Sequence, residues 1–121
     1  MFLYVLSLEF GKYYVGKTKD LVRRGIEHRN GRGAEWTKTY PLVGLEHWFF
    51  GDETQEDLLT MMVMKRYGIS NVRGGRWCSL TLSDSTIERL ELEIGDIENF
   101  VFDNSCMLCR GNLLNSPCSL H

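Results

Sequence analysis

Two short apolar runs near the start of the chain have the composition typical of β-strands. Residues 2–8 and 12–17 are short runs rich in Tyr, Val and Leu, and a Glu-Phe-Gly tripeptide separates them. Such a pattern predicts a β-hairpin whose turn uses Gly11 at a positive φ. Because side chains alternate faces along a strand, only strand pairing with an even residue sum would place Tyr4 and Tyr14 on one face.

Later periodic segments predict three helices and one further strand. We expect helices over about residues 19–30, 54–67 and 83–100, and a third strand over residues 42–50, antiparallel to the first hairpin. Residues 34–41 are expected to form a polar and aromatic loop. The sequence therefore predicts an α+β fold, with a small three-stranded antiparallel sheet flanked by helices.

With 121 residues, of which 43% are hydrophobic, the chain can bury one core and carry a small appendage. We assign residues 1–80 to a core domain, 81–101 to a C-terminal helix packed on it, and 102–121 to a zinc-binding tail. No apolar run is long enough to span a membrane, and the apolar start lacks a basic leader, so a strand explains it better than a signal peptide. We expect an intracellular protein of the cytoplasm or nucleus, neither secreted nor partnered with a membrane.

The net charge of −2 hides a division along the chain. Residues 11–40 hold eight Lys or Arg against three Asp or Glu, a balance of +5, whereas residues 81–105 hold seven acidic groups against one Arg, a balance of −6. A basic region of this kind suits a phosphate backbone, and the acidic region would then face away from it. The alternative is that both regions are ordinary solvated surfaces of opposite sign.

The predicted helix over residues 19–30 carries Asp20, Arg24 and His28 at a spacing of four residues, which aligns them on one helix face. Together with Tyr4 and Tyr14, the first 28 residues hold two phenols, a guanidinium and an imidazole. Hydrolysis of a phosphodiester requires proton-transfer groups and a stabiliser of anionic charge, and this set contains both.

In this order and spacing, these residues resemble the GIY-YIG nuclease family. The resemblance covers roughly residues 2–77, and its motifs are strong evidence only as an ordered set. They are Phe2-Leu3-Tyr4 as a degenerate first tripeptide, Tyr14-Val15-Gly16 as the second, the Arg24 to His28 spacing, and the segments Gly33-Ala34-Glu35-Trp36-Thr37-Lys38 and Tyr67-Gly68-Ile69-Ser70-Asn71-Val72-Arg73-Gly74-Gly75.

The resemblance implies a metal-dependent DNA endonuclease that uses Mg²⁺ or Mn²⁺. In this interpretation Tyr4 is the general base, Tyr14 orders the attacking water or the water of the metal, and Arg24 holds the scissile phosphate through its planar fork. His28 relays a proton or binds the phosphate. Lys12 and Lys17 flank Tyr14 and are expected to lower its pKa.

Several cations are expected to contact the DNA backbone. For Arg73 and Arg76, which flank a Gly pair, a surface turn with charged edges is an equal alternative. The expected nucleic-acid-binding residues are Lys12, Lys17, Arg23, Lys38, Arg73 and Arg76.

The chain departs from the family at the metal-binding glutamate, which the family places on the helix after the third strand. The interior of the corresponding helix here has no carboxylate, and only Glu56 and Asp57, in its first turn, could approach the site. Magnesium usually keeps several waters, so one carboxylate could suffice. Otherwise the protein is a catalytically inactive nucleic-acid-binding module on the same fold.

Four cysteines complete the candidate chemistry. A C-x2-C pair and a C-x2-H pair, eight residues apart, predict a tetrahedral zinc site made by Cys106, Cys109, Cys118 and His121. The segment partly resembles a zinc knuckle, although Leu114 stands where a strict knuckle would have His. The alternative is a frayed tail of reduced thiols, and a protein-interaction adaptor built on this tail is a third functional class. Cys78, beside Trp77, is expected to be buried and inert.

Overall fold

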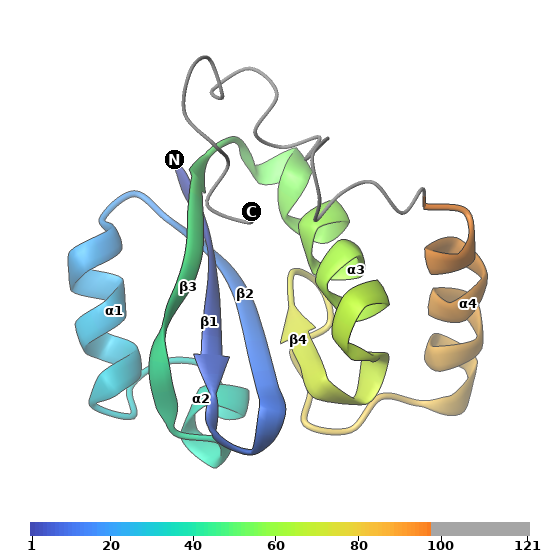
Figure 1. Ribbon diagram of the computed structural model, residues 1–121, viewed down its shortest axis with the longest axis horizontal. Coiled ribbons are helices and arrows are strands. Elements are labelled where there is room, and N and C mark those ends of the chain that lie inside the picture. The colour runs from blue at the N-terminus through green and yellow to red at the C-terminus, as the bar shows by residue number, and fades with distance from the viewer. Residues whose placement is uncertain (98–121) are drawn as a thin grey trace.

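A four-stranded sheet forms the centre of an α+β fold in the computed structural model, which describes residues 1–97 (Figure 1). The sheet order is β3-β1-β2-β4. The strands are β1 (Phe2–Leu8), β2 (Lys12–Thr18), β3 (Leu42–Phe50) and β4 (Val72–Gly74), and the helices are α1 (Leu21–Arg29), α2 (Glu35–Thr39), α3 (Glu56–Tyr67) and α4 (Asp84–Gly95). The predicted zinc site lies outside the described residues.

The predicted register of the first hairpin is confirmed. β1 and β2 pair antiparallel with even residue sums, so that Tyr4 lies opposite Gly16 and Leu6 opposite Tyr14. The turn between them has two consecutive positive φ angles, 65° at Phe10 and 70° at Gly11. β3 pairs antiparallel with β1, as expected for residues 42–50.

The prediction of three antiparallel strands is wrong, because a fourth strand joins the sheet. β4 runs parallel to β2, with Tyr13 opposite Val72 and Val15 opposite Gly74. It has only three residues, which is too short for an alternation of apolar and polar positions to be recognised. The sheet is therefore mixed.

The helices begin near their predicted capping residues. The Asp20 side chain accepts a hydrogen bond from the backbone N–H of Arg23 (3.0 Å) and so caps α1, and Ser83 caps α4 in the same way through Thr86. The segment predicted as a loop contains the short helix α2, which the indole of Trp36 anchors by donating to the carbonyl of Tyr13 (2.9 Å). In residues 1–97 no helix is both long and apolar enough to cross a membrane.

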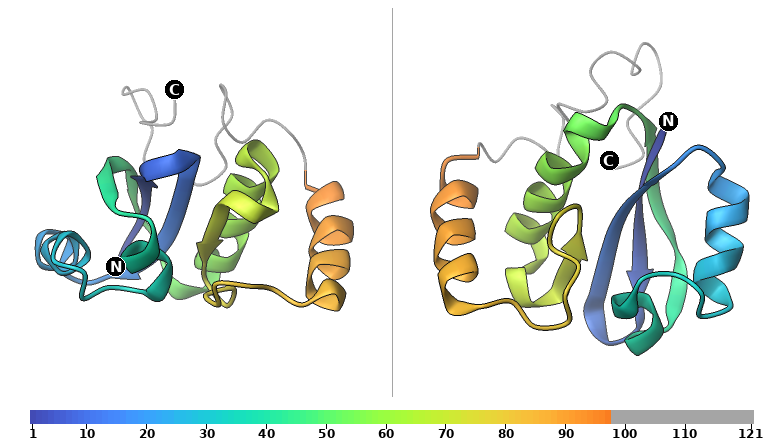
Figure 2. Two further views of the ribbon diagram at one scale, coloured as in Figure 1. Left: turned by 90° about the horizontal axis from the view of Figure 1, so that it is seen from below. Right: turned by 180° about the vertical axis from the view of Figure 1, so that it is seen from behind.

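The two faces of the sheet carry different helices, because alternate residues of each strand point to opposite sides. α1 and α3 lie on opposite sides of the sheet, and α4 packs outside α3 (Figures 1 and 2). One face packs an apolar cluster against α3 and α4; the residues that represent it here are Leu3, Val5, Val15, Leu59, Val63 and Leu90. The other face packs an aromatic cluster toward α1 and α2, made by Tyr4, Leu6, Leu8, Tyr14 and Trp36.

Candidate active site

Two phenols and an imidazole meet between the sheet and α1. The Oη atom of Tyr4 lies 2.9 Å from Nε2 of His28. The ring of Tyr14 lies 5.2 Å from the imidazole and 6.4 Å from the ring of Tyr4, measured between centroids. All three side chains are buried. The structure thus brings together three of the four residues that the sequence assigned to catalysis, from β1, β2 and α1.

Two glycines leave the space that these rings occupy. A Cβ atom on Gly16 would collide with the phenol of Tyr4, directly across the hairpin. A Cβ atom on Gly33 would collide with the imidazole of His28. Both positions therefore require glycine because a side-chain ring lies against the backbone.

Arg24, the fourth predicted catalytic residue, lies at the rim of this cluster. Its guanidinium is close enough to Tyr4 to oppose the rise of that phenol's pKa, and its Nη1 atom lies 3.0 Å from Oε1 of Glu27. The Arg24 side chain is about one-third exposed, at 32%. It lines a shallow pocket with Thr18, Lys19, Asp20, Arg23 and Glu27. A guanidinium in this position can face an anion in solvent while it contacts a buried phenol.

Burial sets the protonation states of the cluster. The pKa of Tyr4 is raised by its burial, although the hydrogen bond from Arg24 opposes that shift. The pKa of Tyr14 is also raised by burial, so the prediction that Lys12 and Lys17 lower it is wrong. Burial lowers the pKa of His28 to about 4, and the positive charge of Arg24 contributes. Near neutral pH the phenols therefore keep their protons and the imidazole is uncharged.

Lys12 and Lys17 do not lower the pKa of Tyr14, and the ammonium group of each lies beside other partners. Nζ of Lys12 lies 2.9 Å from Oδ1 of Asn71 and 5.2 Å from the centroid of the Tyr40 ring. Nζ of Lys17 lies 3.6 Å from Glu56 and 3.8 Å from Glu53. Lys17 is thus placed beside a carboxylate of the candidate metal site.

The two candidate metal ligands in the first turn of α3 differ in their surroundings. The Glu56 side chain is only 13% exposed, and it is close enough to both phenols to raise their pKa values. Burial in turn raises the pKa of Glu56. Asp57 instead accepts hydrogen bonds from the backbone N–H of Arg76 (3.0 Å) and from its Nε (2.9 Å). Glu56 is therefore the better candidate ligand.

A metal held by residues 1–97 would need ligands besides their side chains, such as water or substrate phosphate. In the part of the chain that the structure describes, no group of three or more His, Cys, Asp and Glu side chains could hold a metal ion. A lone carboxylate fits Mg²⁺ or Mn²⁺, because Mg²⁺ is commonly bound by one or two carboxylates, waters and substrate phosphates. The donor set suits such an ion and not a closed site built from protein ligands.

The prediction that Arg73 contacts nucleic acid is wrong. Its side chain is buried, and its guanidinium donates to the carbonyl oxygens of Val72, Ile69, Ser79 and Leu80 at 2.8–3.1 Å. It also lies 4.5 Å from the centroid of the Trp36 ring. Arg73 therefore holds the chain around β4 in place and has no free face for a phosphate. Arg23, Lys17, Lys38 and Arg76 are exposed, and Lys12 is half-buried.

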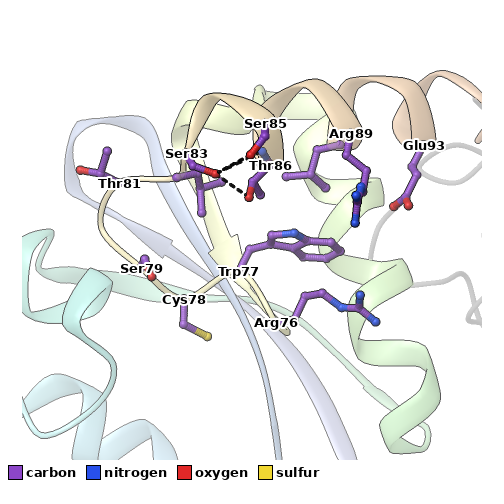
Figure 3. A pocket seen from close by; sticks show the side chains of 12 residues that line it. Arg76, Trp77, Cys78, Ser79, Thr81, Ser83, Ser85, Thr86, Arg89 and Glu93 are labelled. Carbon is purple, nitrogen blue, oxygen red and sulfur yellow. Dashed lines mark hydrogen bonds between the residues drawn. The ribbon is translucent and has the colours of Figure 1, made fainter.

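The prediction that Cys78 is buried is also wrong, because its side chain is exposed. Its thiol lies 3.0 Å from the carbonyl oxygen of Gly75. Cys78 belongs to a cleft between the segment after β4 and the helix α4. Figure 3 shows the buried Trp77 at its centre, with the side chains of Arg76 and Arg89 on either side of the indole.

Comparison with known proteins gives partial matches to one family. The chain is 39% identical over 51 residues to a UPF0213 protein of Fusobacterium nucleatum, a match that covers 42% of this chain and 51% of that protein. It is 35% identical over 57 residues to a UPF0213 protein of Staphylococcus saprophyticus, covering 47% of this chain and 70% of that protein. The chain belongs to the UPF0213 family.

A third UPF0213 protein, from Halobacterium salinarum, is 42% identical over 45 residues, which cover 37% of this chain and 58% of that protein. The chain thus spans about half the length of the Fusobacterium relative. No family model matches the chain, and no solved structure matches it.

The sequence did not indicate a role for one polar residue of this candidate site. Thr37 on α2 is buried, and its Oγ1 atom lies 3.0 Å from Nδ1 of His28, on the side of the ring opposite Tyr4. The signal available was the segment Gly33–Lys38, which resembles the nuclease family but had no residue role attached. Because residues 34–41 were predicted to form a loop and not the helix α2, the sequence did not indicate that Thr37 would contact the imidazole.

Proposed function

We propose that this UPF0213 protein is a GIY-YIG-type endonuclease that hydrolyses phosphodiester bonds in DNA with Mg²⁺ or Mn²⁺. The observation that supports it best is the convergence of Tyr4, Tyr14, Arg24, His28 and Glu56 from β1, β2, α1 and α3. These are phenols, a guanidinium, an imidazole and a carboxylate, which together supply proton transfer, anion stabilisation and a metal ligand.

Arg24 is the proposed phosphate ligand. Its Nη1 atom is engaged by Glu27, and its partly exposed side chain lines the shallow pocket on α1. A planar fork that is held at one end can present its remaining N–H groups to two phosphate oxygens. Charge that develops on the phosphate in the transition state would be stabilised there.

Tyr4 and His28 form the proposed proton path. A water proton passes to Oη of Tyr4 while the phenolic proton passes to Nε2 of His28, which lies 2.9 Å away. The water oxygen forms the new P–O bond, the P–O bond to the leaving oxygen breaks, and that oxygen takes a proton from solvent. The imidazolium then returns its proton to solvent. The negative charge of a bound phosphate would raise the basicity of the imidazole.

Glu56 is the proposed metal ligand, and Tyr14 the phenol that orders water beside it. A divalent ion supplies charge that polarises the phosphate. Glu56 is the carboxylate that influences the pKa of both phenols, which supports its assignment to this role. Asp57 remains engaged with Arg76.

Exposed cations near the site support a DNA backbone as the substrate. Arg23 neighbours Arg24 on α1, and its side chain is 76% exposed. Lys38 and Arg76 are exposed as well. Such cations contribute affinity through the phosphates without reading sequence. In the same proposal the thiols Cys106, Cys109 and Cys118, with His121, bind zinc in the tail.

The alternative is a DNA-binding module that does not cut. It is favoured because residues 1–97 contain no group of three or more side chains that could hold a metal, and because the ammonium of Lys17 lies beside Glu56. Incubation with nicked, branched and single-stranded DNA, with Mg²⁺ or Mn²⁺ and with a chelator as the control, separates the two. Cleavage that needs the metal and is lost in Arg24→Ala supports the nuclease. Binding of the same DNA without cleavage under any divalent ion favours the inactive module.

A further inference from the structure

The hydroxyl of Thr37 stands at the end of a buried chain of hydrogen bonds. Its Oγ1 atom lies 2.8 Å from the carbonyl oxygen of Ala34 and 3.0 Å from Nδ1 of His28. A carbonyl oxygen only accepts hydrogen bonds, and a hydroxyl has one proton to donate. The Thr37 proton is therefore committed to Ala34, and toward His28 the hydroxyl oxygen can only accept.

This requirement determines which ring nitrogen of His28 carries hydrogen. Nδ1 must donate to Thr37, so it is protonated. The imidazole is neutral near pH 7 because burial lowers its pKa to about 4, and a neutral imidazole has one N–H. Nε2 therefore presents its lone pair toward Tyr4.

Arg24 imposes the same direction from the other end. Its guanidinium can only donate, so its attraction to the Tyr4 oxygen, which opposes the rise of that phenol's pKa, turns the phenolic proton away from it. The phenolic proton then points to Nε2 of His28. From Tyr4 onward, each group donates to the next, through His28 and Thr37 to the carbonyl of Ala34.

We propose that Thr37 is a positioning residue that holds His28 in the Nδ1–H tautomer and thereby makes Nε2 the acceptor of the Tyr4 proton. The catalytic part of this inference rests on the proposed nuclease function, whereas the tautomer does not. Without the Thr37 hydroxyl both neutral tautomers become accessible, and the Nε2–H form cannot take a proton from Tyr4. Gly33 supports the arrangement, because a Cβ atom there would collide with both the imidazole and the Thr37 hydroxyl.

The tautomer can be measured without DNA or metal, from the ¹⁵N chemical shifts of the histidine rings near pH 7. The chain has three histidines, and the His28 signals are identified by their loss in His28→Asn. We expect a protonated Nδ1 and an unprotonated Nε2 in the wild type and in Thr37→Ser, which keeps the hydroxyl. In Thr37→Val, which keeps the shape and lacks the hydroxyl, we expect the Nε2–H tautomer to appear.

Thr60→Val is the matched control. Thr60 is also buried, and its hydroxyl donates to a carbonyl in its own helix, that of Glu56 (2.8 Å), but it does not contact His28. This variant should lose stability in the same way as Thr37→Val and leave the His28 signals unchanged. A wild-type spectrum with protonated Nε2, or a Thr37→Val spectrum identical to the wild type, would overturn the inference. The wild-type result decides even if Thr37→Val does not fold.

The catalytic consequence is tested by single-turnover cleavage. Substitution of residues that orient a metal-ligating histidine costs about 10–100-fold in metal affinity or activity, which gives the order of magnitude for an oriented imidazole. We expect a loss of that size in Thr37→Val at saturating protein, with DNA affinity unchanged, and near wild-type rates in Thr37→Ser. Equal rates in all three proteins would overturn the positioning role. Nδ1 protonation in a protein that cleaves no DNA would instead reject the nuclease proposal and keep the tautomer.

Discussion

The two faces of the sheet use alternate residues of the same strands for different purposes. Toward α3, β1 and β2 contribute Leu3, Val5 and Val15, which pack with aliphatic and methionine side chains. Toward α1 the same strands contribute Tyr4 and Tyr14, which meet an imidazole and a guanidinium. One face is an apolar core. The other is also buried, yet a chain of hydrogen bonds connects Tyr4, His28 and Thr37 within it.

The difference shows how a small domain can hold reactive groups without losing its core. Buried polar groups cost free energy unless they are paired, and here Tyr4, His28 and Thr37 are paired with one another and with the carbonyl of Ala34. The opposite face supplies apolar burial with no such requirement. Substitutions on the face toward α1 should therefore mainly lower activity. Substitutions on the apolar face toward α3 should mainly lower the free energy of unfolding.

The largest effect is expected for Arg24→Ala, which should lower the single-turnover rate of DNA cleavage by about 10²–10³-fold. The side chain is one-third exposed and forms no part of the apolar face, so the free energy of unfolding should change by less than about 1 kcal/mol. Arg23→Ala is the matched control, since it removes the adjacent and more exposed charge. Cleavage by Arg24→Ala within tenfold of the wild type would contradict the assignment.

On the apolar face, Leu59→Ala should lower the free energy of unfolding by about 2–5 kcal/mol while the folded protein keeps its cleavage rate. Leu59 is fully buried in the cluster between the sheet and α3. Denaturant titration measures the first quantity, and single-turnover cleavage at a temperature where the variant is folded measures the second. A specific loss of rate in the folded variant would show that the two faces are not separable.

The free energy of unfolding of the wild type should fall at acid pH because of His28. The imidazole has a pKa of about 4 in the folded protein and an ordinary value near 6.5 when unfolded. Between these values the unfolded chain binds a proton that the folded chain does not, so stability falls as pH falls through that window. The loss attributable to His28 should reach about 3 kcal/mol at most. Urea titrations from neutral to acid pH should give a flatter dependence in His28→Asn, and equal slopes would mean that His28 is not buried as a neutral ring.

The smallest effect is expected at Lys17, the ammonium beside Glu56. A metal ion on this carboxylate would lie within about 6 Å of the ammonium, so Lys17→Met should tighten Mn²⁺ binding roughly threefold to tenfold. Titration calorimetry with Mn²⁺ alone measures it, and Lys19→Met is the control for a general loss of positive charge. Unchanged or weaker binding in Lys17→Met would contradict the competition between the two cations. Unchanged binding in Glu56→Gln would instead remove Glu56 as the ligand.

Much of the candidate site was predictable because it depends on local periodicity. The even residue sum of the hairpin set Tyr4 and Tyr14 on one face, and the four-residue spacing on α1 aligned Arg24 with His28. These are properties of neighbouring positions in one element or one hairpin. The resemblance to the nuclease family additionally predicted that the hairpin and α1 contribute to one site.

The errors lie where a residue's environment depends on distant segments. The sequence predicted Arg73 to be a surface cation because it lies beside two glycines. In the structure its guanidinium donates to four carbonyl oxygens from residues 69–80. Cys78 reads as buried because it follows Trp77, yet its side chain is exposed. Lys17 was predicted to lower the pKa of Tyr14, yet its ammonium forms ion pairs with Glu53 and Glu56. Burial instead raises the pKa of Tyr14.

By itself, the sequence determined the hairpin and its register, the helix that carries Arg24 and His28, and the α+β class. It could do so because short-range periodicity and capping chemistry decide these features. Only the tertiary structure decided that β4 joins the sheet in parallel, that α2 brings Thr37 to His28, and that Glu56 is largely buried whereas Asp57 pairs with Arg76. Those outcomes depend on which distant groups share a buried volume, and burial and pairing are properties of the whole fold rather than of any local pattern.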